Sequence, residues 1–560
     1  MTGDSPWLVH YAPGVPAEAT IPEGSVVDLL ANAQRTFADK VALDFFSATT
    51  SYRSLWTEAC RAATVLHELG VRPGDRVALV LPNCPQHVVA FYGALRLGAI
   101  VVEHNPLYTQ EELGRQFADH SPTVVVAWDA VAPMAAAVLP SETTVLAVDI
   151  TRALPLGKRL ALRLPIARAR KTRAAMTTPA PTLPSWDRAI AGAQPIADPV
   201  PRPSAQDVAL LQYTGGTTGV PKGAILTHRN LVANAAQSAA WAPGLVPGEE
   251  TFYAVLPLFH VYGLTLCFTT ALLLGATVVL FPRFDVDLVL DAMKRRPATF
   301  LPGVPPMYPR LVERARERGV PLTSAKIALA GAMSLPPETV DLWESASGGL
   351  LIEGYGMTET SPISVGNPIA DNRRPGSIGV PYPSTEIRVT DRTDPTMDVA
   401  PGEPGELLIR GPQVFSGYWD RPEDTAATLL PGGWVHTGDI VVQDADGFLR
   451  IVDRIKELIL VGGFNVYPSE VEAVLVTLPG VAQAAVVSLP ADGGGEQVVA
   501  AVVPMPGATL DPDAIRSACR EHLAGYKVPR RVVVMDDLPY STIGKVMRNA
   551  VRDRLLESTV

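Results

Sequence analysis

A strand–helix–strand pattern within residues 75–105 constrains the fold of this chain more than any other feature. Residues 76–81 (RVALVL) form an apolar run that is typical of a buried strand, and residues 85–97 are predicted to form a helix that ends at Gly98. Residues 100–102 (IVV) form a second apolar strand. A unit of this kind is the sign of a layered α/β domain.

The same alternation of helix and strand returns later in the chain. A helical pattern at residues 285–295 precedes an apolar run at 298–301, and a short strand at 326–330 ends at Gly331. The 560 residues are too many for one hydrophobic core, so at least two domains are expected. With 47% hydrophobic and 19% charged residues, the chain can bury large cores and is not a disordered polymer.

The sequence changes in character around Arg454. Ser469 and Glu472 have the S-x-x-E spacing of a capping box, which predicts that a helix begins there. The elements expected next are two strands, a helix, a third strand and a terminal helix; the first four lie at residues 481–489, 497–503, about 511–523 and 531–535. This pattern predicts a small α+β domain of about a hundred residues.

Residues 264–281 have almost the length of a membrane-spanning helix. Gly275 divides the run: the part before it suits a buried helix, and the β-branched part after it (ATVVLF) suits a buried strand. We therefore expect a helix, a cap and a strand here rather than a transmembrane span.

Charge and cysteine content narrow the class of protein. A net charge of −10 argues against general nucleic-acid binding, which needs a basic surface. The four cysteines, at positions 60, 84, 267 and 519, have no zinc-ligand spacing and are expected to be buried apolar residues in a reducing cytosol. The N-terminus lacks the basic start and apolar run of a signal peptide, so a cytoplasmic location is expected.

Residues 151–176 are rich in arginine and lysine and contain no acid. One interpretation is peripheral contact with an anionic membrane surface, at the inner face of the membrane. The other is a solvated surface excursion, because Pro155 and Pro165 would interrupt a long amphipathic helix. The sequence leaves both open.

A glycine- and threonine-rich segment at residues 213–223 (YTGGTTGVPKG) follows an apolar strand at 208–213. Glycines let the backbone approach an anion closely, and threonine hydroxyls and Lys222 add donors and a positive charge, so the segment is predicted to hold phosphate. It is not a Walker-type loop, because Gly223 follows the lysine instead of preceding it. A second apolar stretch, 224–226, comes next, and Thr227 is predicted to cap a helix.

These residues resemble the adenylate-forming superfamily of acyl-CoA synthetases, luciferases and adenylation domains. The loop matches that family's YT[SG]GTTGxPKG signature, and further segments similar to its signatures follow in order at 257–263 (PLFHVYG), 331–333 (GAM), 355–360 (YGMTET), 434–439 (WVHTGD), 453–457 (DRIKE) and 541–545 (STIGK). The resemblance implies a large N-terminal adenylate-forming domain at 1–455, with layered α/β parts and a β-rich part. It also implies a small, mobile α+β C-terminal domain at 456–560, with a hinge near Lys456.

The resemblance also implies roles in the nucleotide site. Glu359 would bind Mg²⁺, Thr358 would touch the α-phosphate of ATP, and Tyr355 would stack on adenine. Asp439 and Arg454 would hold the ribose. The full set implied for the nucleotide is Thr214, Gly215, Gly216, Thr217, Thr218, Gly219 and Lys222 on the β- and γ-phosphates, together with Gly354, Tyr355, Gly356, Asp439, Ile451 and Arg454.

Lys545 matches the catalytic lysine that bridges the acid and the α-phosphate in the family. His260 is interpreted either as lining the acyl and thiol channels or as a packed residue without a direct role. The resemblance implies an acyl pocket lined by Tyr262, Gly263, Val304, Gly331, Ala332, Met333 and Met357. The substrates implied are a carboxylic acid, ATP and coenzyme A.

Within the family, bacterial long-chain fatty acid–CoA ligases are the closest match, on the N-terminal PWLVHYAPGVP and on residues 103–109 and 458–468. Alternatives remain: a medium-chain or aryl acid–CoA ligase, an amino-acid adenylation domain, or a non-catalytic acyl or nucleotide binder. Gly432, where the fatty acyl signature often has an acid, and Gly462-Gly463, where some relatives carry a lysine, depart from the pattern. A homodimer is one expectation for the assembly.

Overall fold

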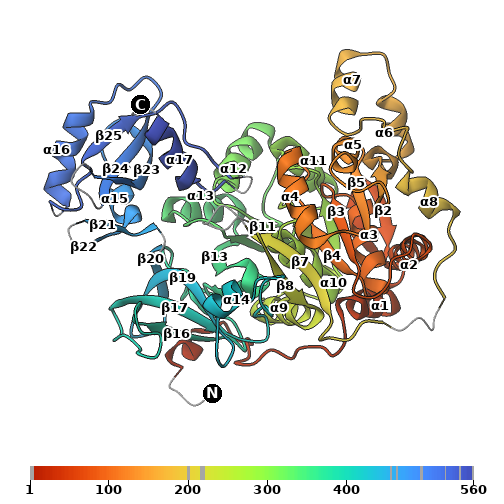
Figure 1. The fold of residues 1–560 in the computed structure, drawn as a ribbon, viewed down its shortest axis with the longest axis horizontal. Helices are drawn as coiled ribbons and strands as arrows, with labels where there is room; N and C mark the ends of the chain where they lie inside the picture. The colour runs from red at the N-terminus through yellow and green to blue at the C-terminus, as the bar shows by residue number, and fades with distance from the viewer. Residues whose placement is uncertain are drawn as a thin grey trace. The chain divides into compact units, whose positions relative to one another are not determined.

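The computed structural model describes residues 5–197, 202–214, 221–454, 457–461, 464–491, 496–523, 525–541 and 544–557. The chain divides into two compact units (Figure 1). The larger unit comprises Leu8–Glu386 and Arg410–Val435. The smaller comprises Met1–Trp7, Ile387–Ile409 and His436–Val560. The predicted boundary at Lys456 falls on residues 455–456, outside the described part, and stays a prediction.

A six-stranded sheet lies in the first half of the larger unit. Its order is β6-β5-β3-β4-β7-β8, with bounds Thr144–Val148, Val124–Trp128, Arg76–Val80, Ile100–Glu103, Val208–Thr214 and Lys222–Thr227. All neighbours are parallel except β7 and β8, which form an antiparallel hairpin. Helix α3 (Pro85–Arg96) joins β3 to β4, so the predicted strand–helix–strand unit is confirmed.

A nine-stranded sheet forms the second layer of the larger unit, in the order β15-β14-β13-β12-β11-β9-β10-β1-β2. The bounds are Val380–Pro381, Ile363–Gly366, Leu350–Gly356, Ile327–Ala330, Phe300–Gly303, Thr251–Ala254, Thr277–Leu280, Val41–Phe45 and Ala48–Ser51. From β13 to β1 the neighbours are parallel, and both edges are antiparallel. The predicted strands at 298–301 and 326–330 are β11 and β12.

Helices cover these sheets, and several begin with a side-chain cap. Thr227 caps α9 (His228–Trp241), as predicted, and shares a capping box with Asn230. Apart from α3 and α9, the α-helices of five residues or more in the described part of this unit are α1 Val26–Phe37, α2 Tyr52–Glu68, α4 Gln110–His120, α5 Ala132–Ala136, α6 Leu156–Ala161, α7 Ala167–Ala174, α8 Trp186–Gly192, α11 Val286–Arg295, α12 Met307–Arg318, α13 Pro337–Ser347 and α14 Pro422–Thr428.

The apolar run at residues 264–281 folds as the sequence predicts. A π-helix at Gly263–Thr269 continues into α10 (Thr270–Leu273), and Gly275 then takes a left-handed backbone conformation, with φ 63°, before β10. Among the residues that the structure describes, no helix has the length and hydropathy needed to cross a membrane. The four cysteines are all buried, as expected.

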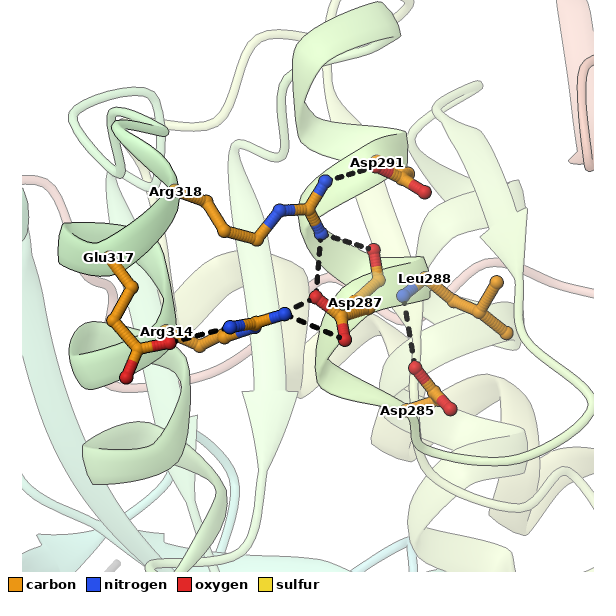
Figure 2. Close-up of polar contacts among 7 residues, drawn as sticks. All are labelled: Asp285, Asp287, Leu288, Asp291, Arg314, Glu317 and Arg318. Atoms are coloured by element: carbon orange, nitrogen blue, oxygen red, sulfur yellow. Dashed lines mark hydrogen bonds and ion pairs between the residues drawn. The ribbon is translucent and has the colours of Figure 1, made fainter.

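Helices α11 and α12 are joined by a network of exposed ion pairs (Figure 2). Asp287 accepts hydrogen bonds from Arg314 at 2.9 Å and from Arg318 at 2.8 Å, and Arg318 also reaches Asp291 at 2.5 Å. Exposed pairs contribute little to the free energy of unfolding. They link the helices that precede and follow β11, the strand that leads to Val304.

Glu353, on β13, is a buried carboxyl group with few partners. One carboxyl oxygen accepts a hydrogen bond from the Leu335 backbone N–H at 3.3 Å, and the other has no partner in the described part of the chain. Burial raises the pKa of Glu353 from 4.5 to about 8. The folded state therefore retains a proton that the unfolded state loses, and the free energy of unfolding should fall as pH rises from 4.5 to about 8.

We expect Glu353→Gln to raise the melting temperature at high pH, because glutamine keeps the acceptor for Leu335 and cannot ionise. The gain should be on the order of 1–3 kcal/mol near pH 9 and much smaller near pH 5. Thermal unfolding of both proteins at the two pH values measures it. Equal effects at the two pH values would show that the carboxyl ionises at its ordinary pKa.

The smaller unit contains a β-rich part and an α+β part. The β-rich sheet contains β16 Glu386–Thr390, β17 Pro404–Arg410, β19 Trp434–Gln443, β18 Leu429–Leu430 and β20 Leu449–Arg454. Some of these residues belong to the larger unit. The α+β part contains the hairpin β21–β22, the sheet β23-β24-β25 and three helices. Their bounds are Ile459–Val461, Phe464–Val466, Val481–Pro490, Glu496–Pro504, Arg531–Val534, α15 Pro468–Leu475, α16 Pro512–His522 and α17 Arg548–Glu557.

The predicted capping box at Ser469 and Glu472 is wrong, although a helix does begin there. The N-cap of α15 is Tyr467, and Pro468 occupies the first turn, where its missing N–H costs nothing. The Ser469 backbone N–H and hydroxyl instead donate to Asp453 at 3.1 and 2.9 Å. Glu472 accepts from the Val486 N–H at 2.7 Å and pairs with Arg548. Tertiary partners therefore replace the local box.

Candidate active site

Many of the predicted site residues follow the carboxyl ends of neighbouring parallel strands. Residues 257–263 follow β9, Val304 follows β11, Gly331 follows β12, and Tyr355 and Met357 lie at the end of β13. Parallel strands present their carboxyl ends at one edge of the sheet, where open α/β sheets bind ligands. The topology therefore brings four segments that are far apart in sequence to one edge.

Tyr262 lies at the centre of the predicted acyl pocket. Its hydroxyl donates to the carbonyls of Gly303 and Leu329, each at 3.0 Å, so the ring is fixed to β11 and β12. A Cβ on Gly331 would lie 3.1 Å from this ring, which explains the glycine. Val304 is buried. The structure therefore groups the Tyr262 ring with Gly331 and with the end of β11.

The other predicted pocket residues lie nearby in the chain. Gly263 is buried and opens the π-helix. Ala332 is exposed and has a left-handed backbone, with φ 68°, while Met333 and Met357 are half-buried.

His260 stands just before the π-helix. Its Nδ1 accepts a hydrogen bond from the Tyr262 backbone N–H at 3.2 Å. Burial lowers the pKa of His260 to about 4, so the imidazole is neutral near pH 7. A neutral ring can line a channel or accept a proton, and the structure gives it no anionic partner in the described part of the chain.

The predicted phosphate loop closes the hairpin of β7 and β8. Thr214 and Lys222 are directly opposed in this hairpin, and residues 215–219 lie outside the described part of the chain. The Lys222 ammonium forms an ion pair with Asp424 and lies 5.5 Å from the centre of the Tyr418 ring. The hairpin therefore fixes both ends of the loop, and Lys222 lies at one of them.

Tyr213 anchors the hairpin at its base. Its hydroxyl donates to Asp119 at 2.7 Å, and Arg421 pairs with the same carboxylate at 2.6 Å. Burial, and then the hydrogen bond to Asp119, raises the pKa of Tyr213, so the hydroxyl stays protonated. Strand β7 is thereby held at the start of the loop.

Glu359, the predicted magnesium ligand, is buried in the turn Thr358–Thr360. Tyr418 donates its hydroxyl to the Glu359 carboxylate at 2.5 Å, and the Phe415 backbone N–H donates to the Glu359 carbonyl at 2.9 Å. Thr358, beside it, is half-buried. Burial, and then the Glu359 charge, raises the pKa of Tyr418, so this bond persists at neutral pH.

Residues 415–419 join the phosphate hairpin to Glu359. Backbone bonds run from Ile225 to Gly417 at 2.9 Å and from Trp419 to Gly223 at 2.8 Å, so this segment lies along β8. Tyr418 thus touches both Glu359 and Lys222. Sequence reasoning missed Tyr418 and Asp424, because each meets its partner only across a long separation in the chain.

The donor set at Glu359 fits a magnesium ion. Mg²⁺ is a hard cation that takes one or two carboxylates together with phosphate oxygens and water. Glu359 supplies a carboxylate on the element that is hydrogen-bonded to the phosphate hairpin through residues 415–419. Tyr418 uses one carboxylate oxygen and orients the other.

The predicted ribose residues belong to strands β19 and β20. Asp439 is buried and lies directly opposite Arg454 in this antiparallel pair. Ile451, also on β20, is 39% exposed. The Arg454 side chain lies outside the described part. The backbone register nevertheless places the two predicted sugar ligands side by side.

Lys545 follows a tight turn in the smaller unit. The Ser541 N–H donates to the Lys545 carbonyl at 2.7 Å, and the Lys545 N–H donates to the Ser541 hydroxyl at 3.1 Å. Residues 542–543 lie outside the described part, as does the predicted hinge residue Lys456. Helix α17 begins three residues later, at Arg548, which pairs with Glu457 and Glu472.

Comparison with known proteins adds to this geometry. Residues 30–419 match the family model described as AMP-binding enzyme, and residues 470–545 match AMP-binding enzyme C-terminal domain. A long-chain-fatty-acid–CoA ligase of Bacillus subtilis is 36% identical over all of this chain and 98% of its own length. A feruloyl-CoA synthase of Amycolatopsis is 35% identical over 90% of this chain and 94% of its own length.

Solved structures of related enzymes have the same fold as this chain. ATP-bound MatB from Rhodopseudomonas palustris superposes with a TM-score of 0.81 and 32% identity, covering 94% of this chain and 98% of that one. The chain belongs to the AMP-binding enzyme family. The predicted α/β class, with a large N-terminal and a small C-terminal domain, is confirmed. Membership also confirms an acid–thiol ligase for which ATP and coenzyme A are implied.

Proposed function

We propose that this protein is a long-chain fatty acid–CoA ligase, which converts ATP, a fatty acid and coenzyme A to acyl-CoA, AMP and diphosphate. The arrangement that best supports the chemistry is Tyr418, which links the Glu359 carboxylate to the phosphate hairpin and Lys222. Full-length similarity to the Bacillus subtilis ligase supports the substrate class.

The reaction requires two like-charged groups to meet in line. The fatty acid carboxylate attacks the α-phosphorus, and the bond from that phosphorus to the diphosphate breaks. The β- and γ-phosphates are held by Thr214, residues 215–219 and Lys222. The reacting groups are contacted by Thr358 and Lys545. All these residues position the reactants and stabilise charge. Coenzyme A thiol then attacks the acyl carbon and expels AMP.

Glu359 would hold Mg²⁺, which supplies charge neutralisation at the phosphates when it is bound. Tyr355, flanked by Gly354 and Gly356, would stack on adenine, and Asp439 and Arg454, with Ile451 beside them, would hold the ribose. The pocket around Tyr262 and Gly331 would receive the acyl chain, with His260 at its entrance.

The second half-reaction needs a different surface of the C-terminal domain at the active site. We propose that the C-terminal domain, residues 456–560, turns about Lys456 after adenylation, so that Lys545 leaves and coenzyme A enters. Proline at position 456 would restrict the backbone torsion that such a turn must change. A homodimer and a peripheral location at the inner face of a membrane remain predictions.

A panel of acids tests the substrate class. Thioester formation should be fastest with long-chain fatty acids and much slower with ferulate, benzoate and medium-chain acids. Preference for ferulate would instead favour an aryl acid–CoA ligase, the alternative that the Amycolatopsis relative raises.

We expect Tyr418→Phe to lower adenylation about 10- to 100-fold and to raise the Mg²⁺ concentration needed for half-maximal activity. Phenylalanine keeps the ring near Lys222 but removes the donor that orients Glu359. A magnesium titration of acyl-adenylate formation measures both effects.

Tyr253→Phe is the matched control, because the Tyr253 hydroxyl also donates to a single partner, the Arg296 carbonyl at 2.7 Å. It should leave the magnesium dependence unchanged. If Tyr418→Phe gives the same magnesium curve as the parent, Tyr418 does not position a metal ligand.

A further inference from the structure

Residues 150–176 form a projection anchored at both ends to the six-stranded sheet. At one end the Thr151 N–H donates to Asp149, just after β6, at 3.0 Å. At the other end the indole N–H of Trp128, at the end of β5, donates to the Met176 carbonyl at 2.8 Å. Helices α6 and α7 lie between these anchors and extend away from the sheet in Figure 1.

Large apolar side chains of this projection face solvent. Leu156 is 69% exposed, Leu160 54%, Leu164 51% and Ile166 53%. Leu156 and Leu160 are four residues apart in α6 and therefore share one face of that helix. A surface that exposes four large aliphatic side chains within eleven positions is typical of a binding site rather than of a solvated excursion.

Basic residues alternate with these apolar residues along the projection. The projection carries Arg152, Lys158, Arg159, Arg163, Arg168, Arg170, Lys171 and Arg173. Arg152 pairs with Asp149, and Lys158 donates to the Phe46 carbonyl at 3.0 Å. None of the other six forms an ion pair with an acid in the described part of the chain. Their charge is left uncompensated in a protein whose net charge is −10.

We propose that residues 156–173, here called the α6–α7 surface, dock on an anionic phospholipid bilayer. The leucine and isoleucine side chains enter the interface, and the arginine and lysine side chains bind lipid phosphates while their aliphatic stems lie along the apolar layer. We infer a bilayer as the partner because its negative charge complements the positive charge of the α6–α7 surface. This inference is independent of the proposed enzymatic function.

The combination of apolar and basic groups distinguishes a bilayer from nucleic acid. RNA or DNA would need the cations but would gain nothing from exposed leucines without aromatic side chains for base stacking. The α6–α7 surface has no aromatic residue in its sequence. Short helices separated by Pro165 suit a shallow interfacial position rather than a span.

Flotation of the purified full chain with vesicles tests the proposal. Binding is expected to phosphatidylcholine vesicles with about one third phosphatidylglycerol, to be weak for phosphatidylcholine alone, and to fall as salt rises. Arg163→Gln/Arg168→Gln/Arg170→Gln/Lys171→Gln should weaken partitioning on the order of several hundredfold. Leu156→Ser/Leu160→Ser/Leu164→Ser/Ile166→Ser should weaken it at least about tenfold.

A matched charge control uses four exposed cations elsewhere, Arg283→Gln/Lys294→Gln/Arg316→Gln/Arg530→Gln, and should float like the parent. Circular dichroism and melting temperature show that each variant is folded. The proposal is overturned if the parent does not float with anionic vesicles, or if the control weakens binding as much as the α6–α7 variants do. Tighter binding to a single-stranded RNA oligomer than to these vesicles would also overturn it.

Discussion

Lys545→Ala should slow acyl-adenylate formation by about 100- to 1,000-fold and leave thioester formation from supplied acyl-adenylate almost unchanged. The ammonium is expected to bridge the acid and the α-phosphate only in the first half-reaction, and removing one such charge-stabilising donor has this size of effect. The turn at Ser541 fixes the backbone of Lys545, so the loss would come from the side chain.

Two assays separate the half-reactions. Release of diphosphate measures adenylation, and consumption of synthetic acyl-adenylate with coenzyme A measures the second step. Lys527→Ala is the control, because Lys527 is a lysine of the same small domain, paired with Glu470 at 2.6 Å. Near-normal diphosphate release by Lys545→Ala would show that Lys545 does not act in adenylation. Equal losses in both steps would indicate a folding defect.

Glu359→Gln should lower adenylation by at least about 100-fold and move the magnesium optimum far upward. Glutamine has nearly the shape of glutamate and can still accept the Tyr418 hydroxyl, so the turn at Thr358–Thr360 should persist. What is lost is the negative charge that a hard cation needs.

Glu338→Gln, on the exposed first turn of α13, provides the control for removing one carboxylate. ATP binding measured by calorimetry with and without Mg²⁺ gives a readout apart from turnover. The parent should bind ATP more tightly with the metal, and Glu359→Gln should lose this difference. If the variant keeps it, another group holds the metal.

Local patterns predicted most of the fold well. The unit β3–α3–β4, the helix and strand around Gly275, and the cap at Thr227 follow from apolar runs, glycine and a capping residue in the immediate sequence. These features depend on neighbours in the chain, which a single sequence displays. The order of the strands in the two large sheets does not depend on neighbours in the chain, and it was not predicted for either sheet.

Where tertiary contacts compete with local ones, the predictions failed or were incomplete. Ser469 had the spacing of a cap, yet its backbone N–H and its hydroxyl donate to Asp453 on strand β20. Tyr418 had no motif at all, because its partner Glu359 lies 59 positions away. Asp424 is likewise recognisable only from its ion pair with Lys222. Contacts of this kind are set by packing and leave no short-range pattern.

Isotope exchange between ATP and diphosphate in the absence of coenzyme A tests most directly whether this site forms an acyl-adenylate. The account predicts rapid exchange that requires a long-chain fatty acid and is reduced at least about 100-fold in Lys545→Ala and Glu359→Gln. Acid-dependent exchange that both variants retain would contradict the roles given to Lys545 and Glu359. No exchange with any acid, although ATP binds, would contradict the account as a whole and favour a non-catalytic nucleotide binder.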